Sequence, residues 1–509
     1  MTTAPTLVPG PAPEPPTPTR TAAPRRRSAR CRLARPLCAL IPVLLILPSV
    51  VLVTACDGAT SEQEPRAGES VDLAGSLAGY NLLLITIDTL RADRLGSFGH
   101  PDPGQSPRID ALAASGTRFL EASAPRGLTW PSLATVLTGQ YPSSHGLIQN
   151  GYSFADDQRT LPHRLQDAGY QTAAVLSNMC QANHRGWDLL ECAGGVDARV
   201  ERKALAWIDQ LDPQRPFFLW AHYFGAHGPY YNGGDRAARI DPGYEGVVEA
   251  KKHVLNRIMT DQIPLDAADQ RHLDALYDAA VQGTDELVGR LLDGLASRGG
   301  LERTAIVLLA DHGEDLYDHH GYIYHACSPY QSGLHVPLLF VLPPALGLAA
   351  PTGGAVAQPV ELTDVLPTLA SLFALPLEGE CIDGTSLVPY LERPERGGEG
   401  KAALSEYGSE RIATVRQGRW KLIVNPDEHR PICLPGAPED LYPIAATELY
   451  DLVEDPAELN DLSGEQPSQV RRLTRLLAER EAAKCGGDGG VQELPEELRR
   501  ELEALGYVN

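Results

Sequence analysis

The chain has 509 residues, of which 43% are apolar, and it carries a formal net charge of −22. This length and apolar content are enough for one large domain and a smaller one. Because the charge is acidic and no basic stripe follows residue 55, the composition argues against nucleic acid as a partner.

The first 56 residues are typical of a targeting segment rather than of a folded domain. The basic run RRRSARCRLAR precedes the apolar run PLCALIPVLLILPSVVLVTAC, which is the order found in export signals. Small residues lead into Cys56, so the segment predicts a bacterial lipoprotein in which Cys56 becomes the lipidated first residue. An uncleaved membrane anchor and a soluble secreted form are the two alternatives. All three possibilities place residues 80–509 outside the cytoplasm, after a solvated linker at 57–79. The lipoprotein and the uncleaved anchor would also attach the protein to a membrane of the cell envelope.

Six cysteines follow Cys56, an even number that is consistent with disulfides in an exported protein. They are Cys180, Cys192, Cys327, Cys381, Cys433 and Cys485. We expect Cys180 to pair with Cys192, because these two bracket a short loop. None of the six shows CxxC spacing, which argues against a zinc knot.

Five apolar runs predict strands that are buried on both faces, because they are continuous and rich in β-branched residues. These runs cover residues 81–88, 172–178, 216–223, 304–312 and 336–343. Helical patterns lie between them at 108–116, 159–169 and 273–299. The alternation predicts an α/β fold, with a large mostly parallel sheet that carries helices on both faces.

The sequence changes character after residue 400. An alternating run at 411–424 and a second run at 447–463 predict a small antiparallel sheet. A polar helix at 467–484 and a final helix at 495–506 follow. We therefore expect a large domain over 80–400 and a smaller α+β subdomain over 401–509.

Polar side chains follow the predicted strands at their carboxyl ends. Asp88 follows the first strand, Asp311 and His312 follow the fourth, and His227 lies just beyond the third. Ligands of open α/β sheets bind at this edge, so Asp88, Asp311 and His312 are candidate ligands for a divalent cation. Each has a structural alternative, since an Asp after a strand often caps a helix and a lone His is often a packing residue.

Thr129 is a candidate nucleophile beside this edge. It lies directly before the apparent helix start PSLATVL, with Pro131 in the first turn. Free N–H groups and the helix dipole favour an oxyanion there, and a nearby cation would lower the pKa of the hydroxyl. The alternative is an ordinary capping threonine.

Several collinear segments carry a family resemblance. Among them are NLLLITIDTLRADRLGSFGH, PSLATVLTGQYPSSHG and LLADHGEDLYDHH. Through them the chain resembles, from residue 80 to its end, the sulfatases of the alkaline phosphatase superfamily. The resemblance implies the fold of that superfamily and a metal-dependent ester hydrolase. It makes Asp88, Asp311 and His312 ligands of one divalent ion, with Thr129 at the nucleophile position, where it also touches the metal. Ca²⁺ is favoured by the family, and Mn²⁺, Mg²⁺ or Zn²⁺ also suit the ligands.

The same resemblance suggests residues that meet the substrate. It makes His145 and His227 contacts to the sulfate or the leaving oxygen, and a histidine there can protonate a leaving group. His325 falls where the family has a substrate-binding Lys or His. We add Arg126 and His319 as substrate-binding candidates.

Two positions depart from the family pattern. Sulfatases use a formylglycine made from the Cys or Ser of a C/S-x-P-x-R motif, whereas this chain has Thr129 and Leu133 at the Cys and Arg positions. Threonine cannot give that aldehyde, so we expect no formylglycine. Lipoteichoic-acid synthases and phosphoethanolamine transferases, related branches of the superfamily, use a threonine beside a similar metal set.

Three functions follow from these observations. The first is a metal-dependent hydrolase of sulfate or phosphate esters, with phosphoesters preferred because a threonyl phosphate can be attacked at phosphorus. The alternatives are a transferase of phospho-groups onto envelope glycans or lipids, and a sulfatase-like binding protein without catalysis. In the enzymatic cases the substrate is a small-molecule, glycan or lipid ester.

Overall fold

The computed structural model describes residues 72–154, 158–178, 185–347, 353–396, 400–407, 412–428 and 442–486, and the backbone of 491–493. Residues 67–509 form one compact unit. The domain boundary at residue 400 stays a prediction. The predicted targeting segment with Cys56 lies outside the described residues. Among the helices of the described part, none combines the length and the apolar character needed to cross a membrane.

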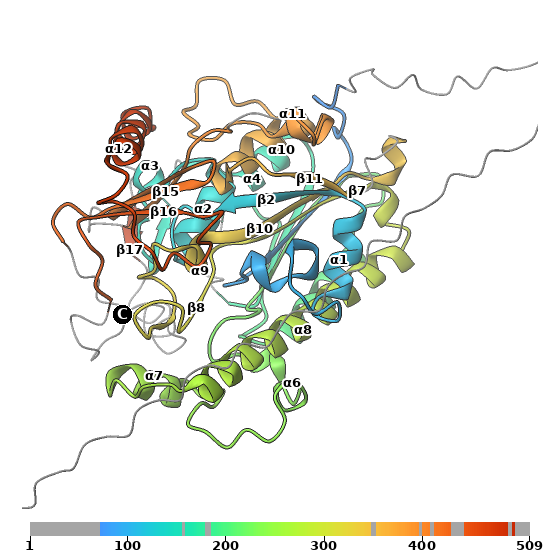
Figure 1. Cartoon of the computed structure of the whole chain (residues 1–509). Helices are drawn as coiled ribbons and strands as arrows, with labels where there is room; N and C mark the ends of the chain where they lie inside the picture. The colour runs from blue at the N-terminus through green and yellow to red at the C-terminus, as the bar shows by residue number, and fades with distance from the viewer. Residues whose placement is uncertain are drawn as a thin grey trace, which may run out of the picture. The chain divides into compact units, whose positions relative to one another are not determined.

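Within the described residues, the larger sheet has nine strands in the order β11-β2-β10-β7-β1-β6-β4-β5, with β12 paired to β2 (Figure 1). They are β1 (Asn81–Ile87), β2 (Thr117–Ser123), β4 (Gln171–Leu176), β5 (Leu189–Cys192), β6 (Phe217–Tyr223), β7 (Thr304–Ala310), β10 (His335–Val341), β11 (Gly354–Val356) and β12 (Val360–Glu361). Five of them, β1, β4, β6, β7 and β10, are the predicted strands. Of the nine, β10 alone runs antiparallel to its neighbours, so the mostly parallel α/β sheet is confirmed.

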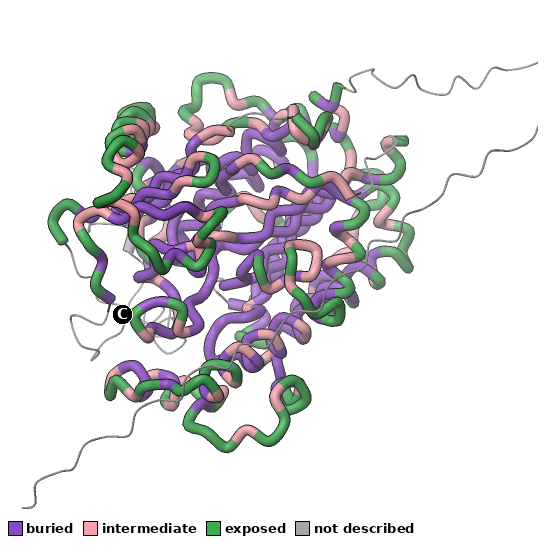
Figure 2. The backbone as a smooth tube through the Cα atoms, in the orientation of Figure 1, coloured by how far each residue is buried: buried purple, intermediate pink, exposed green. Residues whose placement is uncertain are grey.

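The central strands are buried on both faces. Every residue of β7 is buried, and so is every residue of β1 after Asn81. Figure 2 shows this burial along the strands, with the exposed residues gathered in the outer loops and helices. Burial on both faces explains why these strands read as unbroken apolar runs rather than as alternating ones.

The register of the central strands brings their carboxyl ends to one level. Ile87 at the end of β1 pairs with Tyr223 of β6 on one side and with Ala310 of β7 on the other. The residues that follow β1 and β7 are Asp88 and Asp311. They therefore emerge side by side at the same edge of the sheet.

Helices cover both faces of this sheet. The α-helices of the described residues are α1 (Pro107–Ala114), α2 (Thr129–Thr138), α3 (Pro142–His145), α4 (Leu161–Asp167), α5 (Val200–Ile208), α6 (Ala237–Ile240), α7 (Lys252–Thr260), α8 (Ala267–Ser297), α9 (Gln331–Leu334), α10 (Val365–Phe373), α11 (Val388–Glu392) and α12 (Pro467–Ala482). Helix α8 packs on α1 and α5, whereas α2 packs on α4 and α10. In Figure 1, α1 and α8 lie on one side of strands β2 and β10, and α4 and α10 lie on the other.

The smaller sheet is antiparallel, as predicted. Its strands, in sheet order, are β13 (Ala403–Tyr407), β14 (Ile412–Gln417), β15 (Trp420–Val424) and β16 (Thr447–Asp451). Helix α12 covers it, and Leu473 of this helix packs in a small core with Val415, Leu422 and Leu449. Two short antiparallel pairs complete the described strands, β3 (Tyr152–Phe154) with β17 (Val491–Glu493) and β8 (Asp315–Leu316) with β9 (Ile323–Tyr324). The predicted final helix lies outside the described residues.

A disulfide between Cys381 and Cys485 ties the segment after α12 to the loop after α10. Cys192 and Cys327 each take part in a disulfide as well. Cys180 lies outside the described residues, so its predicted pairing with Cys192 stays a prediction.

Removing the Cys381–Cys485 bond is expected to lower the free energy of unfolding by about 2–4 kcal/mol, because the bond closes a long loop in the unfolded chain. The two cysteines are 104 residues apart in sequence. The Cys381→Ser/Cys485→Ser double variant, compared with the parent by urea unfolding, measures the loss and avoids a free thiol. An unchanged midpoint would mean that the packing of α12 alone holds this end of the chain.

Candidate active site

Three fully buried side chains meet at the carboxyl edge of the large sheet. His312 Nε2 lies 3.6 Å from Asp88 Oδ1 and 3.6 Å from Asp311 Oδ2. One ligand atom from each of the three residues falls within 4.8 Å of the others. The strand ends therefore bring together the three residues that the sequence proposes as metal ligands.

The donor set of these residues fits a divalent cation. His312 Nδ1 lies 2.9 Å from the carbonyl oxygen of Gly313, which can only accept, so Nδ1 carries the proton and Nε2 presents a lone pair. Asp311 Oδ2 is buried and has no hydrogen-bond partner among the described residues. Two carboxylates and a lone pair that face one another in a buried space repel, and a cation held by their oxygen and nitrogen atoms removes that repulsion.

Thr89 helps to fix one of these ligands although it has no carboxylate. Its backbone has a φ of 56°, and its N–H donates to Asp311 Oδ1 at 3.2 Å. His312 N donates to the same oxygen at 2.8 Å. Two donors on Oδ1 leave Oδ2 of Asp311 to face His312 Nε2.

Thr129 is the first residue of α2, and its side chain is fully buried. Its Oγ1 lies 3.2 Å from His312 Nε2, so the hydroxyl borders the metal-ligand group. Leu133, one helical turn further on, is buried in the main hydrophobic core. The position where the family has an arginine thus contributes packing and no charge.

Asn150 caps the start of α2 from outside the helix. Its Oδ1 accepts a hydrogen bond from Trp130 N at 2.9 Å, whereas Leu128, at the N-cap position, makes no side-chain cap. Asn150→Ala is therefore expected to lower the free energy of unfolding by about 1 kcal/mol, measured by urea unfolding. Asn150→Asp keeps the acceptor and is the control, because an anion at a helix N-terminus is favourable. Equal losses in both variants would contradict the capping role.

Two further histidines adjoin His312. The ring centroids of His312 and His325 are 4.6 Å apart, and those of His325 and His227 are 4.8 Å apart. His227 Nδ1 lies 2.6 Å from the carbonyl oxygen of Gly228. Burial lowers the pKa of His227 to about 3 and lowers the pKa of His325 well below its usual value. Both rings are neutral in the ligand-free protein, and an anion bound beside them would raise both pKa values.

The remaining candidates make contacts elsewhere. His145 on α3 shares a hydrogen bond of 3.2 Å with Thr135 Oγ1 of α2, and burial lowers its pKa to about 3. Arg126 donates to the carbonyl oxygen of Glu406 at 3.4 Å, and its guanidinium lies over a tyrosine ring of β13. His319 stacks on Tyr330 at 3.8 Å. The substrate roles of these three residues stay predictions.

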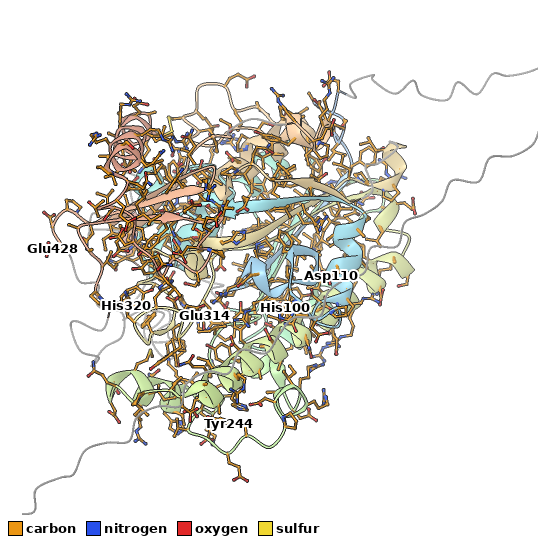
Figure 3. The ribbon with its side chains drawn as sticks, in the orientation of Figure 1. His100, Asp110, Tyr244, Glu314, His320 and Glu428 are labelled. Carbon is orange, nitrogen blue, oxygen red and sulfur yellow. A yellow bond between two sulfur atoms is a disulfide. The ribbon has the colours of Figure 1, made fainter. Side chains whose placement is uncertain are left out.

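Glu314 belongs to the same cluster, and sequence reasoning assigned it no role. Glu314, which is labelled in Figure 3, is fully buried. Its Oε2 lies 2.9 Å from His325 Nδ1. Its Oε1 accepts from Gly228 N at 3.1 Å and from Tyr230 Oη at 3.3 Å. Burial raises the pKa of Glu314 to about 7. An acidic residue two positions after the candidate ligand His312 was the signal available in the sequence.

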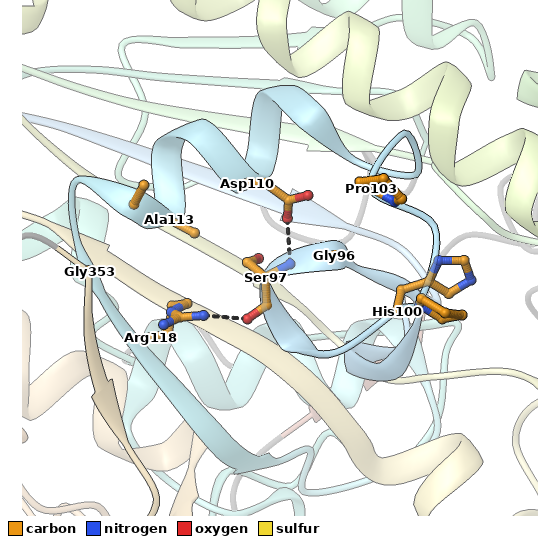
Figure 4. A pocket seen from close by; sticks show the side chains of 10 residues that line it. Gly96, Ser97, His100, Pro103, Asp110, Ala113, Arg118 and Gly353 are labelled. Carbon is orange, nitrogen blue, oxygen red and sulfur yellow. Dashed lines mark hydrogen bonds between the residues drawn. The ribbon is translucent and has the colours of Figure 1, made fainter. Parts of the chain in front are cut away.

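A cavity of about 520 Å³ lies away from this site, between α1 and the amino end of β2 (Figure 4). Two of its charged side chains form hydrogen bonds with the backbone of the adjoining loop. Asp110 accepts from Ser97 N at 2.6 Å, and Arg118 donates to the carbonyl oxygen of Ser97. These contacts hold residues 96–98 in place, and we assign the cavity no catalytic role.

The family model described as "Sulfatase" matches residues 80–375. N-acetylglucosamine-6-O-sulfatase of Bacteroides thetaiotaomicron is 24% identical over 86% of this chain and 90% of its own length. The crystal structure of the phosphonate monoester hydrolase of Agrobacterium radiobacter has a TM-score of 0.60 at 20% identity, over 79% of this chain and 96% of that one. A structure in complex with its substrate D-glucosamine-2-N,6-O-disulfate has a TM-score of 0.62 at 21% identity, over 79% and 98%. At such identities the structural likeness shows the fold.

Proposed function

The chain belongs to the sulfatase family, and from this premise we propose that it is a metal-dependent hydrolase of phosphate-type esters with Thr129 as its nucleophile. The observation that carries the proposal is the 3.2 Å approach of Thr129 Oγ1 to His312 Nε2, which puts a buried hydroxyl beside the ligand group of Asp88, Asp311 and His312. Ser132, the other hydroxyl of this first turn of α2, donates to the carbonyl oxygen of Arg126 at 2.6 Å.

The choice of phosphorus over sulfur follows from how the covalent intermediate can be resolved. A formylglycine hydrate releases its sulfate by collapsing to the aldehyde, an exit that a threonyl ester lacks. A threonyl phosphate can instead be attacked by water at phosphorus, with charge neutralised on the oxygens around it. We therefore expect phosphate or phosphonate esters to turn over faster than sulfate esters.

The residues of the chain divide the chemistry between them. Thr129 loses its hydroxyl proton to water, and its Oγ bonds to phosphorus as the bond to the leaving oxygen breaks. When the anionic ester binds, the pKa of His227 rises and its Nε2 takes up a proton from water, since Nδ1 faces the carbonyl oxygen of Gly228. His227 then gives this proton to the leaving oxygen. Water then attacks the phosphorus, which restores the Thr129 hydroxyl and releases phosphate. A divalent cation on Asp88, Asp311 and His312 would supply charge neutralisation and a lower pKa for the hydroxyl.

The substrate class is proposed from the comparisons and from the expected place of the protein. One relative is named as a sulfatase of N-acetylglucosamine, and one similar structure is that of a phosphonate monoester hydrolase. Both names describe the cleavage of an anionic ester. We propose that the substrate is a small-molecule, glycan or lipid ester. The protein would meet it in the cell envelope, to which we expect it to be exported and attached through Cys56 or the preceding apolar run.

Turnover of matched aryl esters tests the proposal. The exported full chain, loaded in turn with Ca²⁺, Mn²⁺ or Zn²⁺, is assayed with an aryl phosphate, an aryl phosphodiester and an aryl sulfate. We expect at least one phosphoester to exceed the sulfate by roughly 100-fold, a difference of about 2.7 kcal/mol in barrier. Faster sulfate turnover would overturn the argument from the intermediate. Release of the aryl group only when an alcohol acceptor is added would favour the transferase alternative.

A further inference from the structure

We propose that Glu314 is a positioning residue that sets the proton-bearing nitrogen and the orientation of His325, and that also holds the loop carrying His227. This inference rests on the proposed function, because it concerns two histidines to which a substrate role is given. It goes beyond that function in naming the residue that organises them.

The backbone turn that directs Glu314 inward depends on the preceding glycine. A Cβ atom on Gly313 would lie 2.0 Å from the carbonyl oxygen of Ser332, which no side chain tolerates. Gly313 N also donates to the carbonyl oxygen of Gly333 at 2.9 Å. The chain after β7 therefore passes tightly under the α9 segment, and Glu314 is left fully buried beside the ligand His312.

The two oxygens of Glu314 serve two different segments. Oε2 meets His325 Nδ1 at 2.9 Å, and Oε1 accepts from Gly228 N at 3.1 Å and from Tyr230 Oη at 3.3 Å. His325 lies after β9, and Gly228 follows His227 in the loop after β6. One carboxylate thus joins two loops that are far apart in sequence and that each carry a histidine of the site.

The loop that carries His325 needs a stabilising contact, because the residues on both sides of His325 have strained backbone conformations. Tyr324 has a φ of 98° and Ala326 a φ of 80°, both in the left-handed region that favours glycine. Non-glycine residues held there cost on the order of 1–3 kcal/mol each and persist only where the surroundings hold them. The Glu314 contact supplies a fixed partner for Nδ1, which leaves Nε2 of His325 as the nitrogen that can meet a substrate.

Glu314→Gln is the variant that separates positioning from packing. The amide keeps nearly the same volume and an oxygen for Gly228 N, but it turns an N–H group toward His325 Nδ1. Two donors cannot share that contact, so the proton of His325 moves to Nε2. Asp315→Asn is the matched control, because Asp315 is also a buried carboxylate. Its partners are the hydroxyls of Ser332 and Tyr442 rather than a histidine.

The first measurement uses no activity. In ¹⁵N-histidine NMR spectra recorded in mildly alkaline buffer, we expect a proton on His325 Nδ1 in the parent chain and in Asp315→Asn. The Nδ1 signal, assigned by its loss in His325→Ala, should be replaced by an Nε2 proton in Glu314→Gln. An Nδ1 proton retained in Glu314→Gln would overturn the proposal. Circular dichroism of each variant shows whether it is folded.

The second measurement uses the best ester from the aryl series. Glu314→Gln is expected to lower kcat by about 10–100-fold with a smaller change in KM. Adding Glu314→Gln to the His325→Ala variant should lower kcat by less than about 3-fold further, because Glu314 acts through the His325 ring. Fully multiplicative losses would overturn the proposal. Failure of the parent chain on all esters would instead count against the proposed function, and the NMR result would still decide the role of Glu314.

Discussion

Thr129→Ala is expected to lower phosphoester turnover by roughly 10⁴-fold or more, because it removes the attacking atom and leaves the rest of the site in place. The substituted side chain is fully buried and borders His312 at 3.2 Å. Alanine keeps the helix start and the Asn150 cap, which bonds the backbone of Trp130. Steady-state assays of the metal-loaded chain measure the loss.

A second threonine of the same helix gives the matched control. Thr138 is also buried, and its hydroxyl donates to the carbonyl oxygen of Ala134, one turn back in α2, and accepts from Gln140 N at 3.3 Å. Thr138→Ala removes the same atoms as Thr129→Ala and should change kcat by less than about 3-fold. Thr129→Ser, which keeps a hydroxyl, should retain measurable turnover.

Trapping the intermediate separates a nucleophile from a residue that only binds. Rapid acid quench with a phosphoester should leave phosphate on Thr129 in the parent chain, found by peptide mass spectrometry, and none in Thr129→Ala. Turnover that survives Thr129→Ala would refute the threonine mechanism. Equal inactivity of the two proteins on every ester, with the metal still bound, would support the sulfatase-like binding protein.

The part of the site that lies on the central strands could be predicted from sequence, because the physics there is local. Unbroken apolar runs identify β1 and β7 as strands that are buried on both faces of a mostly parallel sheet. Parallel strands end at one edge, so Asp88, Asp311 and His312 were expected at that edge, and the structure adds that β1 and β7 are direct neighbours. The helix start at Thr129 was readable from Pro131 in its first turn.

The contacts made by loops could not be predicted in the same way. The pairing of Glu314 with His325 depends on how residues 315–324 fold back as β8 and β9, which no periodicity reveals. Asn150 reaches the first turn of α2 from a loop twenty residues further on in the sequence. Strand β13 also escaped prediction, because its residues show no clean alternation and are all buried.

Asp311→Asn is expected to have opposite effects on stability without and with a divalent cation, which makes it the sharpest test of the metal site. In the metal-free chain, two carboxylates and the lone pair of His312 Nε2 face one another within 4.8 Å, all fully buried. An amide keeps the Oδ1 acceptor that Thr89 N and His312 N use, and it places a donor where Oδ2 has none. The variant should therefore be more stable than the parent in EDTA, by about 1–3 kcal/mol.

Adding the cation should reverse this order, because binding to the native state alone stabilises the parent by about 2.7 kcal/mol at a concentration of 100 times Kd. The variant, short of one anionic ligand, should gain much less. Thermal unfolding of both proteins in EDTA and in Ca²⁺, Mn²⁺ or Zn²⁺ gives four values per metal, and the sign of their double difference is the result. Asp364→Asn is the control, since Asp364 is a buried carboxylate paired with Lys401, which also keeps Glu361 as a partner. Its loss should cost about 1–3 kcal/mol whether or not metal is present. A parent that is more stable than Asp311→Asn even in EDTA would show that another group already compensates the two carboxylates, and the metal assignment of these three residues would then be wrong.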